Sequence, residues 1–221
     1  MKLKHLLYTA GVLCLFAGNT YATPISYDAG TVYTTEQVVD SSNGANLHGM
    51  EVTACFLSGQ CETILFDGSL GGATFGAAIG DGWQLSLFGD SFHNPFTFTA
   101  DVAITLLHLN GAPGNTVFDV KDIMAGPSGT PGSQSGSFFE VDFFSDISPV
   151  SVLYSNQVWF HQTFYGDLYT SMTVHFDSAG VTGSMSFYAD TDQATVVAVP
   201  LPATGFLLLA GLMALRLRRF N

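Results

Sequence analysis

The central part of this sequence almost lacks positive charge. Five of its six basic residues lie at the two ends of the chain, and Lys121 is the only lysine or arginine between them. Residues 23–199 carry all 18 aspartates and glutamates against that one lysine, which leaves a net charge of −17. Proteins that bind nucleic acids neutralise phosphates with clustered lysines and arginines. The composition therefore argues against nucleic acid as a partner, and equally against anionic polysaccharide and anionic lipid.

Cysteine is also scarce, and the motifs that hold transition metals are missing. Cys14 lies in an N-terminal apolar stretch, so only Cys55 and Cys61 belong to the central part. No His-Glu-x-x-His or Cys-x-x-Cys block accompanies the histidines, and the spacing of a zinc site is lacking. We interpret the histidines of the central part as surface or rim residues. They are His48, His93, His108, His161 and His175.

No segment has the 3.6-residue apolar period of an amphipathic helix. Apolar and polar side chains instead alternate over 96–106, 83–87 and 172–176, which is typical of strands with one buried and one solvated face. Glycine and asparagine turn signals, such as Asn110-Gly111, separate these runs. We predict one all-β domain over residues 23–195, an antiparallel β-sandwich of jelly-roll or immunoglobulin-like type.

The two remaining cysteines fit a short hairpin. Residues 52–56 and 61–66 read as paired strands, and Leu57-Ser58-Gly59 then forms a three-residue loop with Gly59 in the left-handed conformation. This register places Cys55 opposite Cys61, at a separation compatible with a disulfide. We predict that bond for an exported protein, which meets an oxidising compartment; the alternative is two free thiols.

The N-terminal 22 residues have the layout of a secretory signal peptide. Lys2 and Lys4 precede an apolar run over 6–17, and Thr20-Tyr21-Ala22 offers the small residues that signal peptidase reads. We expect passage through the Sec translocon and cleavage after Ala22. A permanent anchor is the alternative, but the run is short for the roughly 20 residues that a spanning helix needs.

The C-terminal segment, residues 196–221, combines three features. A motif over 199–203 (Val199, Pro200, Leu201, Pro202 and Ala203) precedes an apolar helix expected over 204–215 and a basic tail over 216–221 with Arg216, Arg218 and Arg219. Residues 205–215 extend only about 16 Å as a helix, against a hydrocarbon core of about 30 Å. We expect a transmembrane helix that is held briefly, with its arginines cytoplasmic, and then removed. A permanent tail anchor is the alternative.

This three-part pattern resembles the PEP-CTERM sorting domain, in its VPLPA variant. The resemblance covers about the last two dozen residues, and Leu201 stands where the eponymous motif has glutamate. It implies processing by an exosortase, a membrane cysteine protease-transpeptidase of Gram-negative bacteria. It also implies a cell-envelope or extracellular-matrix protein, associated with biofilm or exopolysaccharide.

A second sorting motif overlaps the first. Residues 201–205, Leu-Pro-Ala-Thr-Gly, also match the LPxTG pentapeptide of Gram-positive sortase substrates, which are cut between threonine and glycine. Those substrates usually carry a longer apolar segment and a proline- or threonine-rich stretch that spans the wall, and residues 178–198 show no such stretch. We therefore favour the exosortase interpretation.

One block resembles an enzyme motif. Gly89-Asp90-Ser91-Phe92 is similar to the nucleophile block of GDSL-type esterases, whose serine needs a histidine that a carboxylate orients. The later Asp-x-x-His and Gly-x-Asn-Asp patterns of that family are missing. We interpret the block as a turn at the end of a strand, and the protein as non-enzymatic.

The carboxylates leave a binding function open, because one lysine cannot pair with 18 acids. Asp190 and Asp192 lie near the end of the predicted domain, and four more acids bracket a glycine-rich loop over 126–136: Asp119, Asp122, Glu140 and Asp142. Hard oxygen ligands in loops suit Ca²⁺, although no EF-hand spacing is present, and a solvated acidic face is the alternative. A calcium- or carbohydrate-binding surface module is therefore our second functional class, with neutral polysaccharide as a partner. Aromatic residues over 159–169 could stack on sugars, although core packing is the simpler interpretation.

Overall fold

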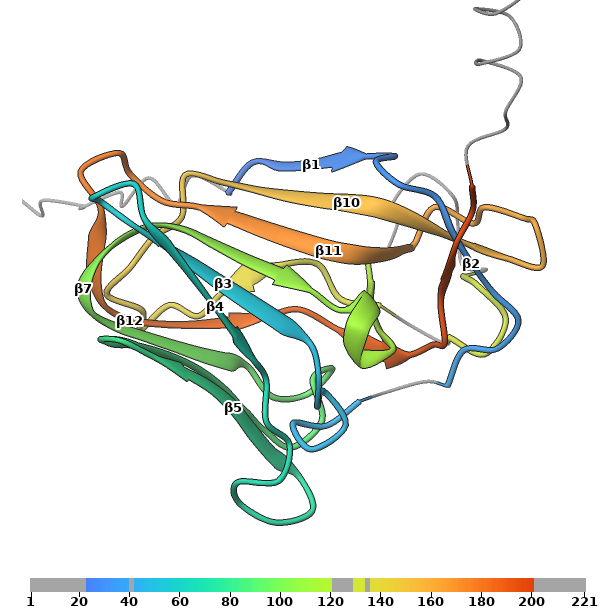
Figure 1. The fold of residues 1–221 in the computed structure, drawn as a ribbon, viewed down its shortest axis with the longest axis horizontal. Helices are drawn as coiled ribbons and strands as arrows, with labels where there is room; N and C mark the ends of the chain where they lie inside the picture. Colours follow the sequence, from blue (N-terminus) through green and yellow to red (C-terminus); the bar gives the residue numbers. More distant parts are fainter. Residues whose placement is uncertain (1–22, 40–41, 121–128, 134–135, 201–221) are drawn as a thin grey trace, which may run out of the picture.

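The computed structural model describes residues 23–39, 42–120, 129–133 and 136–200 (Figure 1). The regular secondary structure of these ranges is all β-strand apart from a single 3-10 turn at Ala112–Gly114, and they contain no α-helix, so the all-β prediction is confirmed. The strands are β1 (Ile25–Asp28), β2 (Tyr33–Thr35), β3 (Glu51–Phe56), β4 (Cys61–Leu65), β5 (Phe75–Gly80), β6 (Trp83–Phe88), β7 (Phe96–Asn110), β8 (Thr116–Asp119), β9 (Glu140–Val141), β10 (Ser151–Phe160), β11 (Leu168–His175), β12 (Val181–Tyr188), β13 (Thr191–Gln193) and β14 (Val197–Ala198).

The expected terminal helices, over 1–22 and 204–215, lie outside the described residues. The same holds for Ala22, for Leu201, Pro202 and Ala203 of the motif, for Arg216, Arg218 and Arg219, and for Asp122. Within the described ranges, no helix is long and apolar enough to cross a membrane.

The strands form one curled mixed sheet organised by β7. The first half of this 15-residue strand pairs with β6 and β12, and its second half pairs with β3 and β11. In Figure 1 the strand bends between these two sets of neighbours. The prediction of antiparallel pairing throughout is wrong at β10, because β1 and β2 both run parallel to it.

The bend of β7 includes a change in which residues face the core. Phe96 and Phe98 are buried as predicted, but Val102 is exposed and Leu107 and Leu109 are buried instead of Leu106. The pairing with β3 moves from Phe56↔Ile104 directly to Cys55↔Leu106, so Thr105 has no partner in that register. One extra residue of this kind is a β-bulge, which shifts the inward-facing set by one position.

Aromatic pairs fill the main core inside the curl. Phe96 stacks on Phe187 with ring centroids 5.3 Å apart, and Phe98 stacks on Phe176 at 5.9 Å. A second, smaller cluster lies near β2, β8 and β13 and contains Val38, Val117, Val158, Leu168 and Ala194. Ala194, between β13 and β14, is the point at which the C-terminal part of the chain enters this smaller cluster.

The cysteine hairpin has the expected register. Cys55 lies opposite Cys61, and the two are joined by a disulfide. Phe56 N–H donates to the carbonyl of Gln60 at 2.8 Å, so the loop consists of residues 57–59, with Gly59 at a φ of +83°. The positive φ favours glycine at this turn position.

Candidate functional site

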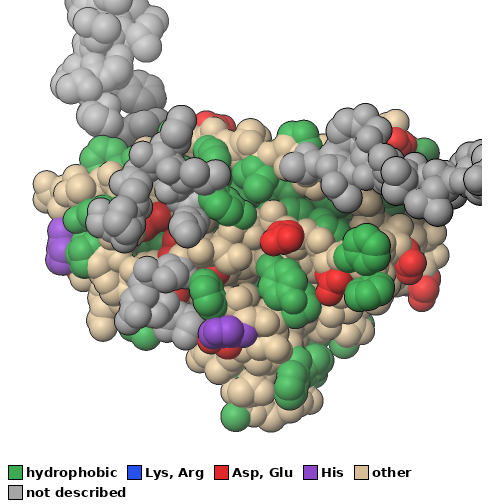
Figure 2. All heavy atoms as spheres, turned by 180° about the vertical axis from the view of Figure 1, so that it is seen from behind, with side chains coloured by type: hydrophobic (Ala, Val, Ile, Leu, Met, Phe, Trp, Pro, Cys, Tyr) green, Lys and Arg blue, Asp and Glu red, His purple; other side chains and the backbone are tan. Residues whose placement is uncertain are grey.

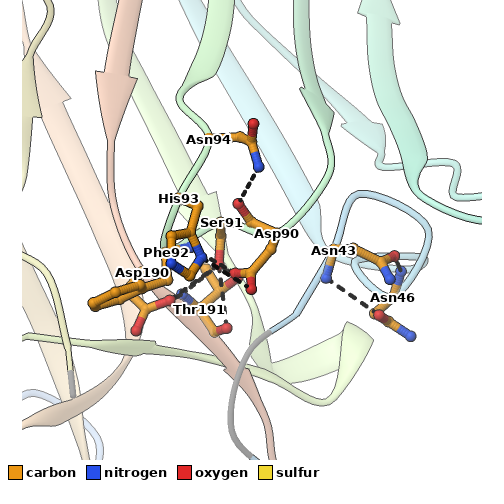
Figure 3. Close-up of polar contacts among 9 residues, drawn as sticks. All are labelled: Asn43, Asn46, Asp90, Ser91, Phe92, His93, Asn94, Asp190 and Thr191. Carbon is orange, nitrogen blue, oxygen red and sulfur yellow. Dashed lines mark hydrogen bonds and ion pairs between the residues drawn. The ribbon is translucent and has the colours of Figure 1, made fainter.

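A densely hydrogen-bonded group of buried polar side chains joins three segments that are far apart in the sequence. Ser91 follows β6, while Asp190 and Thr191 lie at the start of β13 (Figure 3). Thr191 N–H donates to Ser91 Oγ at 3.0 Å and to Asp190 Oδ1 at 2.8 Å, and Thr191 Oγ1 donates to Ser91 Oγ at 2.9 Å. Ser91 N–H donates to the carbonyl of Ser42 at 2.9 Å. The segments around residues 42, 91 and 190 are thus fastened together inside the domain.

Asp190 lies in an environment that disfavours its charge. It is almost fully buried, and its Oδ2 has no hydrogen-bond partner among the described residues. Burial, then the neighbouring carboxylates of Asp192 and Asp119, raise the pKa of Asp190 to about 8, against the lowering effect of its bonds from Ser91 and Thr191. Asp190 therefore holds a proton through much of the neutral range.

The strand pairing explains why these carboxylates are neighbours. Asp119 N–H donates to the carbonyl of Asp190 at 3.1 Å, where β8 runs antiparallel to β13. Residues opposite each other in an antiparallel pair, and residues two apart on one strand, face the same side of the sheet. Asp119, Asp190 and Asp192 therefore share one side, and all three are buried.

The short segment 129–133 closes over this side of the sheet. Ser133 Oγ donates to Asp119 Oδ2, and Thr130 Oγ1 donates to Asp167 Oδ1 at 2.7 Å. Thr130 N–H also donates to Asp167. Asp167 is itself buried and did not stand out in the sequence, because only the tertiary structure places it beside this segment.

The structure brings together half of the calcium candidates. Asp119, Asp190 and Asp192 are neighbours, whereas Glu140 lies on β9 opposite Tyr188 and Asp142 accepts a bond from Phe144 N–H at 3.2 Å. No group of three or more His, Cys, Asp or Glu side chains in the described ranges has the arrangement of a metal site. Asp190 is the member of this set for which the structure gives a cause of protonation, namely its raised pKa.

Ser91 connects its turn to the start of β13 through buried hydrogen bonds. Its side chain is fully buried, and its hydroxyl donates towards Asp190 Oδ1 at 3.1 Å and the carbonyl of Thr191 at 3.3 Å. His93 is three positions from Asp90 and points its Nδ1 at Asp90 Oδ2, 3.4 Å away (Figure 3). Asp90 Oδ1 accepts the N–H of Phe92 at 2.8 Å, as in the turn that the sequence predicts.

A groove lies between β2 and the chain that leads from β13 to β14. Its volume is about 680 Å³. Its lining is mostly neutral hydroxyl and amide side chains, with Glu36 as its only carboxylate among the described residues; it comprises Thr34, Thr35, Glu36, Gln37, Val39, Asn115, Gln193, Ala194, Thr195 and Val197. Glu36 Oε2 lies 2.5 Å from Nδ1 of His161. The sequence offered no signal for this groove, because its walls come from three separate segments.

The surface has no lysine or arginine in the described ranges, and Figure 2 shows carboxylates scattered among neutral and apolar side chains. Three exposed histidines lie beside acids: His48 near Asp67, His93 near Asp90, and His161 near Glu36. His108 and His175 are instead half-buried. Burial lowers the pKa of His108, and its Nδ1 lies 2.8 Å from Thr173 Oγ1.

Aromatic side chains occupy two different settings. Trp159 stacks on Phe164 with centroids 6.3 Å apart; Tyr169 is buried but Phe164 is 38% exposed, so the 159–169 cluster is only partly packed. Phe143 and Phe144, in contrast, are 87% and 88% exposed on the turn after β9. The sequence does not distinguish this pair from Phe138-Phe139, of which Phe139 is buried.

Comparison of the chain with protein-family models, with curated proteins and with solved structures finds no match.

Proposed function

We propose that this chain is an exported, non-enzymatic protein of the bacterial cell envelope or extracellular matrix, sorted by its C-terminal segment. The observation that carries the proposal is the succession of Val199–Ala203, an apolar run and three arginines behind an almost cation-free domain. The resemblance to exosortase substrates makes a Gram-negative host the preferred source. A sandwich of jelly-roll or immunoglobulin-like type is the finer fold that we propose for residues 23–195.

Two features of the domain support export and a passive role. Cys55 and Cys61 form a disulfide in a hairpin, a bond that persists in oxidising compartments. Ser91, the only serine that resembled a nucleophile, is buried and bonded to Asp190 and Thr191 rather than to a histidine. A buried hydroxyl of this kind is unsuited to attack a substrate.

Cell fractionation tests the sorting role. The wild-type chain is expressed beside a deletion of residues 199–221 in a host that has an exosortase. We expect the wild type in the membrane or matrix fraction and the deletion variant in the soluble periplasmic fraction or the medium. Equal retention of both chains would contradict the proposal. Mass spectrometry of the mature C-terminus separates the alternatives, since a terminal Thr204 joined to peptidoglycan indicates a sortase.

A neutral-carbohydrate-binding surface module is the second candidate, and the groove beside β2 favours it. Its hydroxyl and amide side chains can exchange hydrogen bonds with sugar hydroxyls, and the acidity of the domain disfavours anionic glycans. A glycan array with and without Ca²⁺ tests this function. Binding of neutral glycans that is lost in a Gln37→Ala, Thr195→Ala variant would support it, and binding that depends on Ca²⁺ would instead favour the carboxylates.

A further inference from the structure

The sorting motif begins inside the folded domain. β14 (Val197–Ala198) runs antiparallel to β2, with Val197 opposite Thr34 and Ala198 opposite Tyr33. The pairing continues one residue further, because Val199 N–H donates to the carbonyl of Val32 at 2.8 Å. Val199 is the first residue of the motif, so no free linker separates the motif from the sheet. In Figure 1 the last described residues of the chain run along this edge beside β2.

The attachment of β14 is local and shallow. Val197 is 63% exposed and Val199 is 40% exposed, so little apolar surface holds the strand in place. The chain just before β14 is held more firmly, because Ala194 is 3% exposed and its N–H donates to the carbonyl of Asn115 at 2.8 Å. Val196 is half-buried against the smaller cluster, so residues 196–200 detach from β2 with the loss of that contact while β13 and the main core stay in place.

We propose that residues 196–200 are a docking strand, which the sorting transpeptidase binds as an extended chain after β14 has detached from β2. The inference rests on the proposed sorting function and adds where the enzyme docks and what must move. Enzymes that bind peptides as extended strands use the backbone N–H and C=O groups of the peptide. In the folded domain β2 already occupies those groups on one side of β14, and the domain itself blocks that side.

The strand pattern shows which groups hold β14. Val199 bonds to Val32, so Val197, two residues earlier, also directs its N–H and C=O towards β2, opposite Thr34. Tyr33 and Thr35 direct their groups to the other side, where β2 pairs with β10. The β14 side of β2 can thus be changed without altering the sorting motif or the pairing with β10.

An engineered disulfide between β14 and β2, which a reductant can open, tests the proposal; we call this variant the lock. The double variant Thr34→Cys, Val197→Cys places two thiols on opposite residues, within the range that a disulfide spans. A control, Ile79→Cys, Gln84→Cys, likewise places two thiols on opposite residues, here of β5 and β6 and away from β14. Each chain is produced in an exosortase-containing host with and without a reductant. The processed fraction is followed over time by immunoblot, and mass spectrometry confirms each bond.

We expect processing of the oxidised lock to be at least tenfold slower than processing of the oxidised control, with the difference abolished by reductant. Equal rates for lock and control would overturn the docking strand while leaving the sorting function intact. A wild-type chain that is never processed would overturn both.

A second variant weakens the pairing of β14 with β2, whereas the lock fixes it. Thr34→Pro removes an N–H that faces β14 and leaves Val199–Ala203 unchanged. Processing that is as fast as wild type or faster supports the proposal, and slower processing by a variant whose circular dichroism is that of the wild type overturns it.

Discussion

Ser91 donates a hydrogen bond to Oδ1 of Asp190 at 3.1 Å, although 99 positions separate the two residues along the chain. The bond links the turn after β6 to the start of β13. Thr191 adds two further bonds, because its N–H and its hydroxyl both donate to Ser91 Oγ. The block over residues 89–92, which resembles an esterase nucleophile block, therefore has a structural role: it connects the turn after β6 to β13.

Replacing Ser91 by alanine tests this structural role. The change removes Ser91 Oγ, which accepts from Thr191 Oγ1 in a fully buried position, and it removes one bond to Asp190. Loss of a partner for buried polar groups costs about 1–3 kcal/mol. We expect a decrease of that size in the free energy of unfolding, measured by urea titration. Ser58→Ala, at an exposed loop position, is the control and should stay within about 0.5 kcal/mol of wild type. An equal effect of both substitutions would contradict the anchor role.

The raised pKa of Asp190 predicts a stability that falls with rising pH. The folded chain holds this proton up to a pKa of about 8, while the unfolded chain releases it near 3.8. The folded state thus binds more protons than the unfolded state between these two pH values. The contribution of Asp190 to the free energy of unfolding is therefore fully present below about pH 4 and is lost as the pH rises through about 8. The slope contributed by one such proton approaches about 1.4 kcal/mol per pH unit.

Asp190→Asn isolates that contribution, because the amide stays neutral and its oxygen can still accept from Ser91 and Thr191. We expect the variant to gain stability relative to wild type as pH increases from 5 to 9, measured by urea unfolding at several pH values. Asp101→Asn, at an exposed position on β7, should leave the pH profile unchanged. A parallel profile for Asp190→Asn and wild type would show that Asp190 is not the titrating group.

The sequence predicted the disulfide hairpin because its pairing is local. Cys55 and Cys61 are only six positions apart, and a bond that closes so short a loop contributes about 2 kcal/mol by the chain-entropy relation. We expect Cys55→Ser, Cys61→Ser to lower the free energy of unfolding by about that amount in an oxidising buffer. Reductant should lower the stability of wild type to that of the variant and leave the variant itself unchanged. A wild type that is insensitive to reductant would contradict a contribution from this bond.

Other parts of the fold depended on contacts that the sequence pattern does not contain. Alternation placed Phe96 and Phe98 correctly, but both Leu106 and Leu107 are apolar, so the pattern could not indicate the bulge at Thr105 that turns Leu107 inward. Asp190 and Asp192 stood out as a pair two residues apart. Their neighbour Asp119 comes from another strand, and the anchoring by Ser91 arises only when the chain folds.

Hydrogen exchange tests how firmly the start of the sorting motif is held. Val199 N–H bonds to Val32 at the edge of β2, whereas Val174 lies in β11 between β10 and β7. Amides that open locally exchange without unfolding of the domain, while core amides require global opening. In the unprocessed chain we expect the Val199 amide to exchange roughly 100-fold faster than the Val174 amide, or more. The measurement is amide exchange followed by NMR or by mass spectrometry with fragmentation at these residues. Exchange of Val199 at the rate of Val174 would show that β14 opens only when the whole domain unfolds.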